Sequence, residues 1–236
     1  MLRTEINDIL SASRELGWVL EPEAKRLCSL AGLTVPRFAW TNGEEDAVRF
    51  AHEIGYPVVA KVISSQVLHK SDVDGVVVDI DSDEKLREAF HRLSQIIGFA
   101  GMLVEEMVSG IELIAGAKID YQFGPVILLG IGGTGVEIYR DTSLRMAPLT
   151  QVDVESMVKG LKAHQLLEGY RGSEPANLTE LTRMLMAFSD LVMGIEGLIE
   201  SIDLNPVMCS SRRCVIADAR IMLKVEKAPN VPGITQ

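Results

Sequence analysis

The stretch that most constrains the fold of this chain runs from residue 58 to residue 78, with the sequence VVAKVISSQVLHKSDVDGVVV. A β-branched run opens at Val58, is interrupted by the single cation Lys61, and resumes at Val62. A lysine inside such a run must meet an anion or lose its charge, because burying an unpaired ammonium is costly. The pattern therefore predicts a buried strand that carries one charged position.

A polar loop follows this strand and contains His69 and Lys70. It ends at Gly75, which turns the chain into a second apolar strand at Val76–Ile80. A strand lysine followed by a glycine-bearing loop is suited to covering nucleotide phosphates through backbone N–H groups and lysine charge. The alternative is a strand-edge lysine that extends its ammonium into water, with a solvated histidine beside it.

The formal net charge of the 236 residues is −10, which argues against general nucleic-acid binding because that function needs a basic surface. The opening MLRTEINDIL carries acids where a secretory signal would be apolar, and no apolar run approaches the roughly 18 residues of a membrane span. We therefore expect a soluble cytoplasmic protein that binds neither nucleic acid nor membrane. An odd number of cysteines without metal-ligand spacing predicts small buried side chains or free thiols at Cys28, Cys209 and Cys214.

Hydrophobic periodicity predicts helices and strands along the whole chain. Helices are expected at 4–16, 22–31, 44–54, 83–97, 152–161 and 178–193, and strands at 38–40, 58–63, 76–80, 102–108, 111–119, 125–129, 135–139, 144–148, 198–204 and 214–218. The first half has the pattern of helices packed on a small sheet, and the second half is dominated by strands with tight turns. A chain of this length forms one large domain or two closely packed subdomains.

The last two predicted strands carry a second cluster of polar residues. Asp203 and Asn205 lie two residues apart in SIDLNP, so on a strand their side chains point to one face. The segment CSSRRC predicts a hairpin turn that brings Asn205 opposite roughly Asp218 in VIADAR. Two carboxylates and an amide oxygen are hard ligands of the kind that Mg²⁺ prefers, with substrate phosphates completing its shell. The alternative is a set of polar residues that cap strand ends.

Gly130, Gly132 and Gly135 in GIGGTG match the dinucleotide-binding fingerprint G-x-G-x-x-G. That fingerprint must open a helix, whereas the residues after Gly135 alternate as in a strand. We therefore expect a glycine turn whose backbone approaches a ligand or the other subdomain closely, with Glu137 and Arg140 beside it as polar partners or solvated charges.

Taken together, the segments LHKSD, GIGGTGVEI, LLEGYRG and SIDLNP resemble the ATP-grasp subunit of the ADP-forming (NDP-forming) acetyl-CoA synthetases, which are related to the β-subunit of succinyl-CoA synthetase. The resemblance implies an α/β (α+β) ATP-grasp fold in which ATP or ADP binds between two α+β subdomains. The implied divisions are an N-terminal helix at 1–20, a first subdomain at 21–104, a second subdomain at 105–224 and a tail at 225–236.

The resemblance also implies roles for individual residues. His69 matches a histidine that is phosphorylated transiently and passes phosphate toward a partner. The implied nucleotide-binding residues are Lys61 on the phosphates, Gly75 in the covering loop, Glu105, Glu106, Met107 and Val108 in the hinge that reads adenine, and Glu112. The implied Mg²⁺ positions are Asn205 and Asp218, with Asp203 close enough to assist.

The loop after His69 departs from the family pattern at one position. Where relatives tend to have DVGG, this chain has Asp72-Val73-Asp74-Gly75, which adds a carboxylate to a loop expected to cover phosphates. The loop conformation or its nucleotide affinity is therefore expected to differ, although Asp tolerates left-handed turns better than most residues.

The family's CoA-binding module and ligase module have no counterpart within these 236 residues. The resemblance therefore implies one subunit of an acid–thiol ligase, which transfers phosphoryl between ATP or ADP and a histidine while a CoA-binding α-type subunit converts acyl-CoA and phosphate to acid and CoA. Two alternatives remain: a non-catalytic nucleotide-sensing module, and a stand-alone ATP-dependent carboxylate–amine ligase of the same fold.

Overall fold

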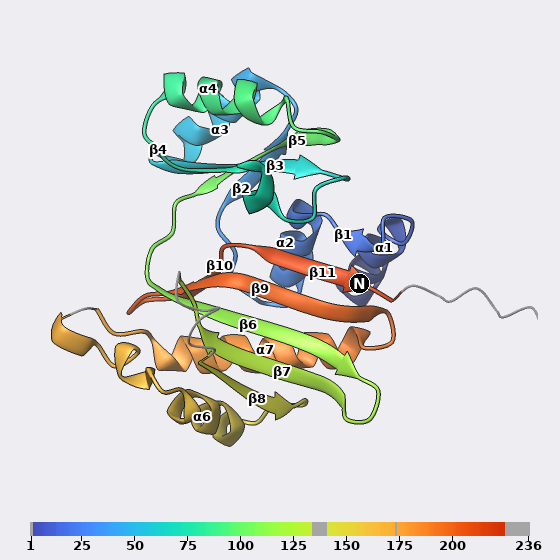
Figure 1. The fold of residues 1–236 in the computed structure, drawn as a ribbon, viewed down its shortest axis with the longest axis vertical. Coiled ribbons are helices and arrows are strands. Elements are labelled where there is room, and N and C mark those ends of the chain that lie inside the picture. The colour runs from blue at the N-terminus through green and yellow to red at the C-terminus, as the bar shows by residue number, and fades with distance from the viewer. Residues whose placement is uncertain (1, 134–140, 173, 225–236) are drawn as a thin grey trace, which may run out of the picture.

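A computed structural model describes residues 2–133, 141–172 and 174–224 of the chain. Two sheets form its framework, and Figure 1 shows them one above the other. The smaller sheet has four strands in the order β2-β5-β3-β4, and the larger has the order β1-β11-β9-β6-β7-β8 with β10 pairing to β9. Neighbouring strands are antiparallel throughout these paths, so the fold contains helices packed on antiparallel sheets.

The helices are α1 (Leu2–Ala12), α2 (Glu21–Leu30), α3 (Glu44–Ile54), α4 (Asp83–Leu93), α6 (Gln151–Gly160) and α7 (Leu178–Ile195), and short 3₁₀ turns occur at η1 (Lys70–Val73), η2 (His164–Leu166) and η3 (Tyr170–Gly172). The strands are β1 (Trp18–Val19), β2 (Phe38–Thr41), β3 (Val58–Ser64), β4 (Val76–Ile80), β5 (Phe99–Glu106), β6 (Ile111–Asp120), β7 (Gly124–Ile131), β8 (Thr142–Met146), β9 (Ile199–Cys209), β10 (Cys214–Ile216) and β11 (Ala219–Leu223).

The smaller sheet is covered on its outer face by α3 and α4 (Figure 1). The apolar stripes of these helices, including Ala51 and Leu86, pack on Val58, Val62 and Val104 of the sheet. All seven residues of β3 are buried, because the strand lies inside the sheet with helices on one face and the rest of the molecule on the other. The predicted buried strand with one charged position is therefore confirmed.

The larger sheet buries its main core against α6 and α7, which lie along one face (Figure 1). Phe188 of α7 and Met157 of α6 are fully buried there against Leu113 and Leu129 of the sheet. The helices α1 and α2 close the end of the sheet formed by β11 and β1. Hence the opposite face of β9 and β11 is turned toward the smaller sheet.

Most predicted elements are confirmed, and α3 and β4 agree with the prediction to the residue. Several bounds shift by a few residues, for example the first helix, which is expected at 4–16 and observed at Leu2–Ala12. The helix expected at 83–97 ends at Leu93, and the closing strand expected at 214–218 is interrupted and continues as β11. The strand β1 was not predicted because two residues carry no periodicity. The strand expected at 135–139 lies outside the described residues.

The subdomain boundaries at 20, 104 and 224 stay a prediction. The division of buried residues between the two apolar cores does not follow these boundaries at α2. Ala24, Leu27 and Cys28 of this helix are buried in the core of the larger sheet, although the sequence places them in the first subdomain. Since α2 follows β1, which pairs with β11, the chain is tied to the larger sheet before it enters the smaller one.

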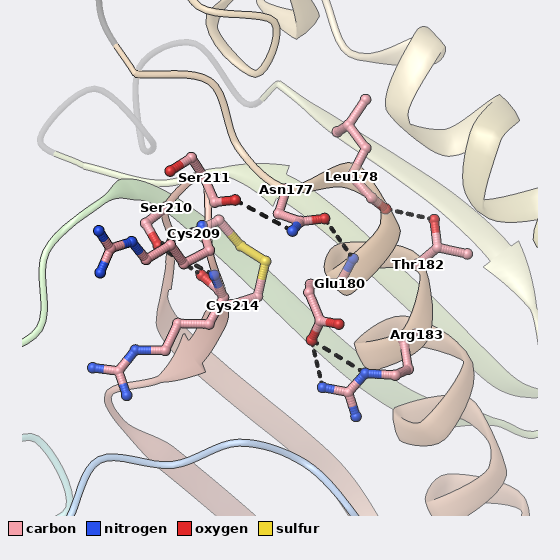
Figure 2. Close-up of a disulfide and its surroundings, with 11 residues drawn as sticks. Asn177, Leu178, Glu180, Thr182, Arg183, Cys209, Ser210, Ser211 and Cys214 are labelled. Atoms are coloured by element: carbon pink, nitrogen blue, oxygen red, sulfur yellow. Dashed lines mark hydrogen bonds and ion pairs between the residues drawn. A yellow bond between two sulfur atoms is a disulfide. The ribbon is translucent and has the colours of Figure 1, made fainter.

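The hairpin between β9 and β10 contains a disulfide between Cys209 and Cys214 (Figure 2). The two residues face each other in the strand register. The prediction of free thiols is therefore wrong for this pair. The hairpin turn, which the sequence predicted correctly at CSSRRC, brings the two sulfurs together. Cys28 is free and buried, and burial raises the pKa of its thiol to about 12. Within the described ranges, no helix has the length and apolar character needed to cross a bilayer.

Candidate functional site

A cleft of about 480 Å³ lies between the two sheets. It is lined by the residues around β1, by the loop that follows β3, and by the facing ends of β9 and β11. Four residues predicted from sequence line it together: His69, Asp203, Asn205 and Asp218. The tertiary structure therefore joins the loop histidine to the polar cluster of the closing strands, which is more than 130 residues away along the chain.

Lys61 lies beside this cleft, and its ammonium is buried among acceptors. Its Nζ lies 2.9 Å from Glu21 Oε1 and 2.8 Å from Glu105 Oε1, and it donates to the carbonyl oxygen of Ala217 at 2.7 Å. Three acceptors match the three N–H donors of an ammonium. Burial would lower the pKa of Lys61, but the charges of Glu21, Glu105 and Asp218 outweigh it and raise this pKa well above 10.5. Lys61 is thus charged and meets anions, which is one of the outcomes that the sequence allows, and these anions are carboxylates.

Glu21, which sequence reasoning missed, is the centre of this buried network. It is the first residue of α2 and contacts Lys25 one helical turn later, at 2.9 Å. Burial would raise the pKa of Glu21, but the charges of Lys25, Lys61 and Lys70 hold it well below 4.5. The spacing of Glu21 and Lys25 is an i, i+4 pair typical of an exposed helix, so the sequence carries no signal that this pair is buried.

Lys25 and Lys70 complete the network from two other elements. Lys25 is fully buried and forms a second ion pair with Glu105. Lys70 reaches down from η1, and its Nζ lies 2.9 Å from Glu21 Oε2 and 3.1 Å from Asp218 Oδ2. Burial would lower the pKa of Lys70, but Glu21 and Asp218 raise it. Three lysines thus meet three carboxylates, so the buried charges balance and the loop after β3 is tied to both sheets.

His69 precedes η1 and contacts an arginine from the opposite sheet. Arg220 Nη1 lies 3.2 Å from both ring nitrogens of His69, and Arg220 Nη2 donates to Asp203 Oδ2 at 3.0 Å. Arg220 and Asp203 are direct register partners on β11 and β9. Burial raises the pKa of Asp203, Arg220 opposes this, and the net direction is upward. Sequence reasoning missed Arg220, although it lies two residues after Asp218 in VIADAR.

The predicted pairing of Asn205 with Asp218 is confirmed. The backbone N–H of Asn205 donates to the backbone carbonyl oxygen of Asp218 at 3.3 Å, next to the register pair of Leu204 and Ala219. Asp203, expected to assist at the same site, lines the same cleft and accepts a hydrogen bond from Arg220. Among the described residues, no group of three or more His, Cys, Asp or Glu side chains is arranged to hold a metal by itself.

The other residues implied to bind nucleotide lie outside the lining of this cleft. Glu105 is buried in the lysine network. Glu106 pairs with Arg213 of the hairpin at 2.7 Å and with Arg37 at 3.9 Å. Burial would raise the pKa of Glu106, but the Arg213 hydrogen bond and the Arg37 contacts lower it. Met107 and Val108 are half-buried in the connection from β5 to β6, and Glu112 is exposed on β6.

Two glycine positions are explained by close packing. A Cβ on Gly75 would lie 2.6 Å from Val62 Cγ1, so only glycine lets the loop return onto β3. A Cβ on Gly132 would lie 2.9 Å from the backbone of Glu112. The close approach is therefore to β6 of the same sheet, and not to the other subdomain as expected. Gly135, Glu137 and Arg140 lie outside the described residues.

The unusual Asp74 has a left-handed backbone conformation, with φ 49° and ψ 36°, at the end of η1. Glycine would adopt these angles without a steric penalty, and Asp is among the residues that tolerate them. The turn therefore forms with Asp at this position, and the Asp74 carbonyl oxygen lies 3.4 Å from Arg92 Nη2.

Comparisons with known proteins agree with this arrangement. Residues 10–223 match the ATP-grasp domain family. The chain is 39% identical over 213 residues to acetate–CoA ligase (ADP-forming) I subunit beta of Pyrococcus furiosus, and the match covers 87% of this chain and 91% of that subunit. The chain belongs to this family of ATP-grasp subunits. The resemblance stated from sequence and the ATP-grasp fold are thereby confirmed.

Further relatives of this ATP-grasp chain include a longer acetate–CoA ligase and a synthetase of known structure. It is 39% identical over 210 residues to acetate–CoA ligase (ADP-forming) II of Archaeoglobus fulgidus, covering 89% of this chain and 31% of that protein. The Candidatus Korarchaeum cryptofilum dinucleotide-forming acetyl-coenzyme A synthetase 1, solved with coenzyme A, Ca-AMPCP and HgCl⁺, matches with a TM-score of 0.86 and 41% identity over 92% of this chain and 99% of that chain. A second structure of this synthetase, with coenzyme A and Mg-AMPPCP, has its phosphohistidine segment pointing towards the nucleotide binding site. This structure matches with a TM-score of 0.82 and 40% identity over 93% of this chain and 100% of that chain.

The chemistry of the cleft fits a nucleotide-bound Mg²⁺. Asn205 and Asp218 present an amide and a carboxylate, which are hard oxygen ligands, and both line the cleft. The Lys70 ammonium 3.1 Å from Asp218 Oδ2 shows that a cation is accommodated at this carboxylate. Because two protein ligands leave most of an octahedral shell open, the site suits a metal that arrives with phosphates.

Proposed function

We propose that this chain is the nucleotide-binding subunit of an ADP-forming acyl-CoA synthetase and transfers phosphoryl between ATP or ADP and His69. The observation that carries this proposal is the shared cleft, in which His69 from the β3–β4 loop faces Asn205 and Asp218 from the larger sheet. In a chain 39% identical to an ADP-forming acetate–CoA ligase subunit, this is the arrangement needed to bring a phosphate acceptor to a nucleotide.

In this proposal the nucleotide binds between the two sheets. Lys61 and Lys70 supply positive charge for its phosphates, the turn at Gly75 holds the covering loop, and Asn205 and Asp218 hold Mg²⁺. When bound, the metal neutralises charge on the transferred phosphoryl group. The adenine contacts expected at 105–108 and at Glu112 need the nucleotide to extend past the lysine network toward the β5–β6 connection. In the structure the ammonium groups of Lys61 and Lys70 form ion pairs with carboxylates, so nucleotide binding requires these ion pairs to rearrange.

The proposed transfer needs one nucleophilic nitrogen. One nitrogen of the neutral His69 imidazole attacks the γ-phosphorus of ATP, so that an N–P bond forms while the bond to the β,γ-bridging oxygen breaks and ADP leaves with the bonding electrons. The other ring nitrogen keeps the proton of the imidazole. The reverse step returns phosphoryl to ADP. Histidine suits this role because the phosphoramidate keeps a high transfer potential, whereas a serine ester would trap the phosphate.

The acyl-CoA chemistry is assigned to a partner. We infer a CoA-binding α-type subunit that exchanges phosphoryl with His69 and converts acyl-CoA and phosphate to acid and CoA. The Archaeoglobus relative supports this division, because this chain matches 31% of its length and the remainder is available for the other modules.

The test is phosphorylation of His69. With [γ-³²P]ATP and Mg²⁺, the full chain should acquire an acid-labile, base-stable label. His69→Ala should lose the label and retain nucleotide binding by calorimetry, whereas His91→Ala, which alters an exposed histidine on α4, should behave as wild type. In the complex with its partner, His69→Ala should also lose acyl-CoA synthesis.

Two other outcomes would favour the alternatives. Nucleotide binding without any label, alone or with partner, would support a nucleotide-sensing module. Ligase activity of the isolated chain with a carboxylate and an amine would support the stand-alone ligase. Full turnover by the His69→Ala complex would rule out the histidine as carrier and favour direct transfer to the partner.

A further inference from the structure

Arg220 connects the loop histidine to the larger sheet through two nitrogens of its guanidinium. Its Nη2 donates to Asp203 Oδ2 at 3.0 Å, and its Nη1 lies 3.2 Å from both His69 Nδ1 and His69 Nε2. Arg220 lines the same cleft as His69 and Asp203. One side of the guanidinium is therefore anchored to a strand neighbour, and the other side lies at the ring that is to carry phosphate.

We propose that Arg220 binds the phosphorylated form of His69 and retains it in the nucleotide cleft. This inference rests on the proposed function, since it requires phosphoryl on His69. Because Nη1 is equally distant from both ring nitrogens, it lies beside the phosphoryl group whichever nitrogen carries it. A guanidinium offers five N–H donors in a planar fork, which matches phosphate oxygens better than an ammonium does.

The carboxylates around His69 would repel a phosphoryl group on its ring, so a phosphorylated His69 needs a cation beside it. Phosphorylation adds about −1.5 to −2 charges at neutral pH. The cleft already contains the carboxylates of Glu21, Asp203 and Asp218, which repel a phosphohistidine. Lys70 is held by two of these carboxylates. Arg220 is paired with the third through Nη2 alone, so the nitrogen nearest the ring is available for phosphate oxygens.

Asp203 acquires a positioning role from the same geometry. It faces Arg220 in the strand register and holds Nη2, so it orients the fork toward His69. Arg220 makes or breaks no covalent bond in this scheme. It lowers the free energy of the phosphorylated histidine in the cleft, which slows loss of the phosphoryl group to water and keeps the loop beside the nucleotide until transfer.

The experiment compares Arg220→Gln with wild type in the full chain. Labelling with [γ-³²P]ATP and Mg²⁺ gives the rate and level of phospho-His69, and removal of the nucleotide gives the lifetime of the label. We expect Arg220→Gln to lower the labelled fraction about tenfold or more, as for loss of a charge-assisted hydrogen bond. The ADP affinity of Arg220→Gln, measured by calorimetry, should change by less than about threefold. The ³¹P resonance of phosphohistidine should also move, which a purely structural role of Arg220 would not produce.

Matched variants sharpen this result. Arg220→Lys, which keeps the charge but loses the fork, should fall between wild type and Arg220→Gln. Arg212→Gln, which removes an exposed arginine from the β9–β10 hairpin, should label like wild type. If Arg220→Gln does not fold, Arg220→Lys and Asp203→Asn carry the test, and both should shorten the lifetime of the label.

Three outcomes separate the hypotheses. Wild-type labelling, lifetime and ³¹P resonance in Arg220→Gln would overturn the role of Arg220 and leave the proposed function intact. An equal loss of ADP affinity and labelling would also overturn it, because Arg220 would then serve the nucleotide. A wild-type chain that takes no label at all, with its partner present, would overturn the proposed function itself.

Discussion

Lys61 on β3 and Glu105 on β5 form a buried ion pair, with Lys61 Nζ 2.8 Å from Glu105 Oε1. In the strand register Glu105 faces Val59, so Lys61 is its diagonal neighbour on the same face of the smaller sheet. Glu21 from α2 binds the same ammonium. The lysine proposed to meet phosphate is therefore also part of what holds the smaller sheet to α2.

We expect Lys61→Met to destabilise the protein as well as weaken nucleotide binding. The sequence alone predicts that methionine would spare the fold, because it keeps the apolar stem. The structure changes this expectation, since the variant leaves two buried carboxylates to share Lys25 and Lys70. Removing one partner of a buried pair costs about 3–5 kcal/mol. Urea denaturation measures this, and Lys85→Met, at an exposed pair, should leave the unfolding free energy nearly unchanged. An unchanged unfolding free energy for Lys61→Met would contradict the network.

The network also predicts how stability depends on pH. The pKa of Glu21 is held well below 4.5 in the folded protein, so its contribution is complete above that pH and is lost as the pH falls through the folded-state value. The pKa of Lys61 is raised well above 10.5, so its contribution is complete below that pH and is lost at more alkaline pH. The difference in unfolding free energy between wild type and Glu21→Gln should therefore be constant between about pH 5 and 10 and shrink below pH 4.5. Denaturant titrations across this range measure it, and a difference that does not shrink below pH 4.5 would contradict the assignment.

Asp218→Asn should weaken Mg²⁺-dependent nucleotide binding more than metal-free binding, because a neutral amide does not offset the charge of the cation. Asp203→Asn should have the smaller effect on Mg²⁺ dependence, since its carboxylate holds Arg220. Calorimetric titrations of ADP with Mg²⁺ and with EDTA provide the comparison. Equal Mg²⁺ dependence in wild type and both variants would place the metal site elsewhere.

Reducing the Cys209–Cys214 disulfide should destabilise the larger sheet modestly. The bridge closes a short hairpin loop, for which the chain-entropy estimate is about 2 kcal/mol. The hairpin also contacts α7, because the Asn177 amide donates to the Ser211 carbonyl oxygen at 3.3 Å (Figure 2). Thermal unfolding with and without a phosphine reductant should differ by about 5 °C, and Cys28→Ser, which leaves the bridge intact, should keep that difference. No effect of reductant would contradict a bridged native hairpin.

The sequence by itself determined the features that depend on neighbours along the chain. The β-branched run around Lys61 predicted a buried strand whose lysine meets an anion or loses its charge, because burying an unpaired ammonium is costly. The alternation in SIDLNP and the turn after it brought Asn205 to Asp218, since a hairpin fixes which residues face each other.

Only the tertiary structure decided which distant groups meet. Glu21 reads as an ordinary exposed helix residue, and it becomes the buried partner of Lys61 because β1 pairs with β11 and carries α2 between the sheets. Arg220 meets His69 across 151 positions because the loop after β3 lies over β11. The cysteine pair required the register of β9 and β10. In each case the periodicity of a segment reports which face is buried, whereas the packing of two sheets decides what that face contacts.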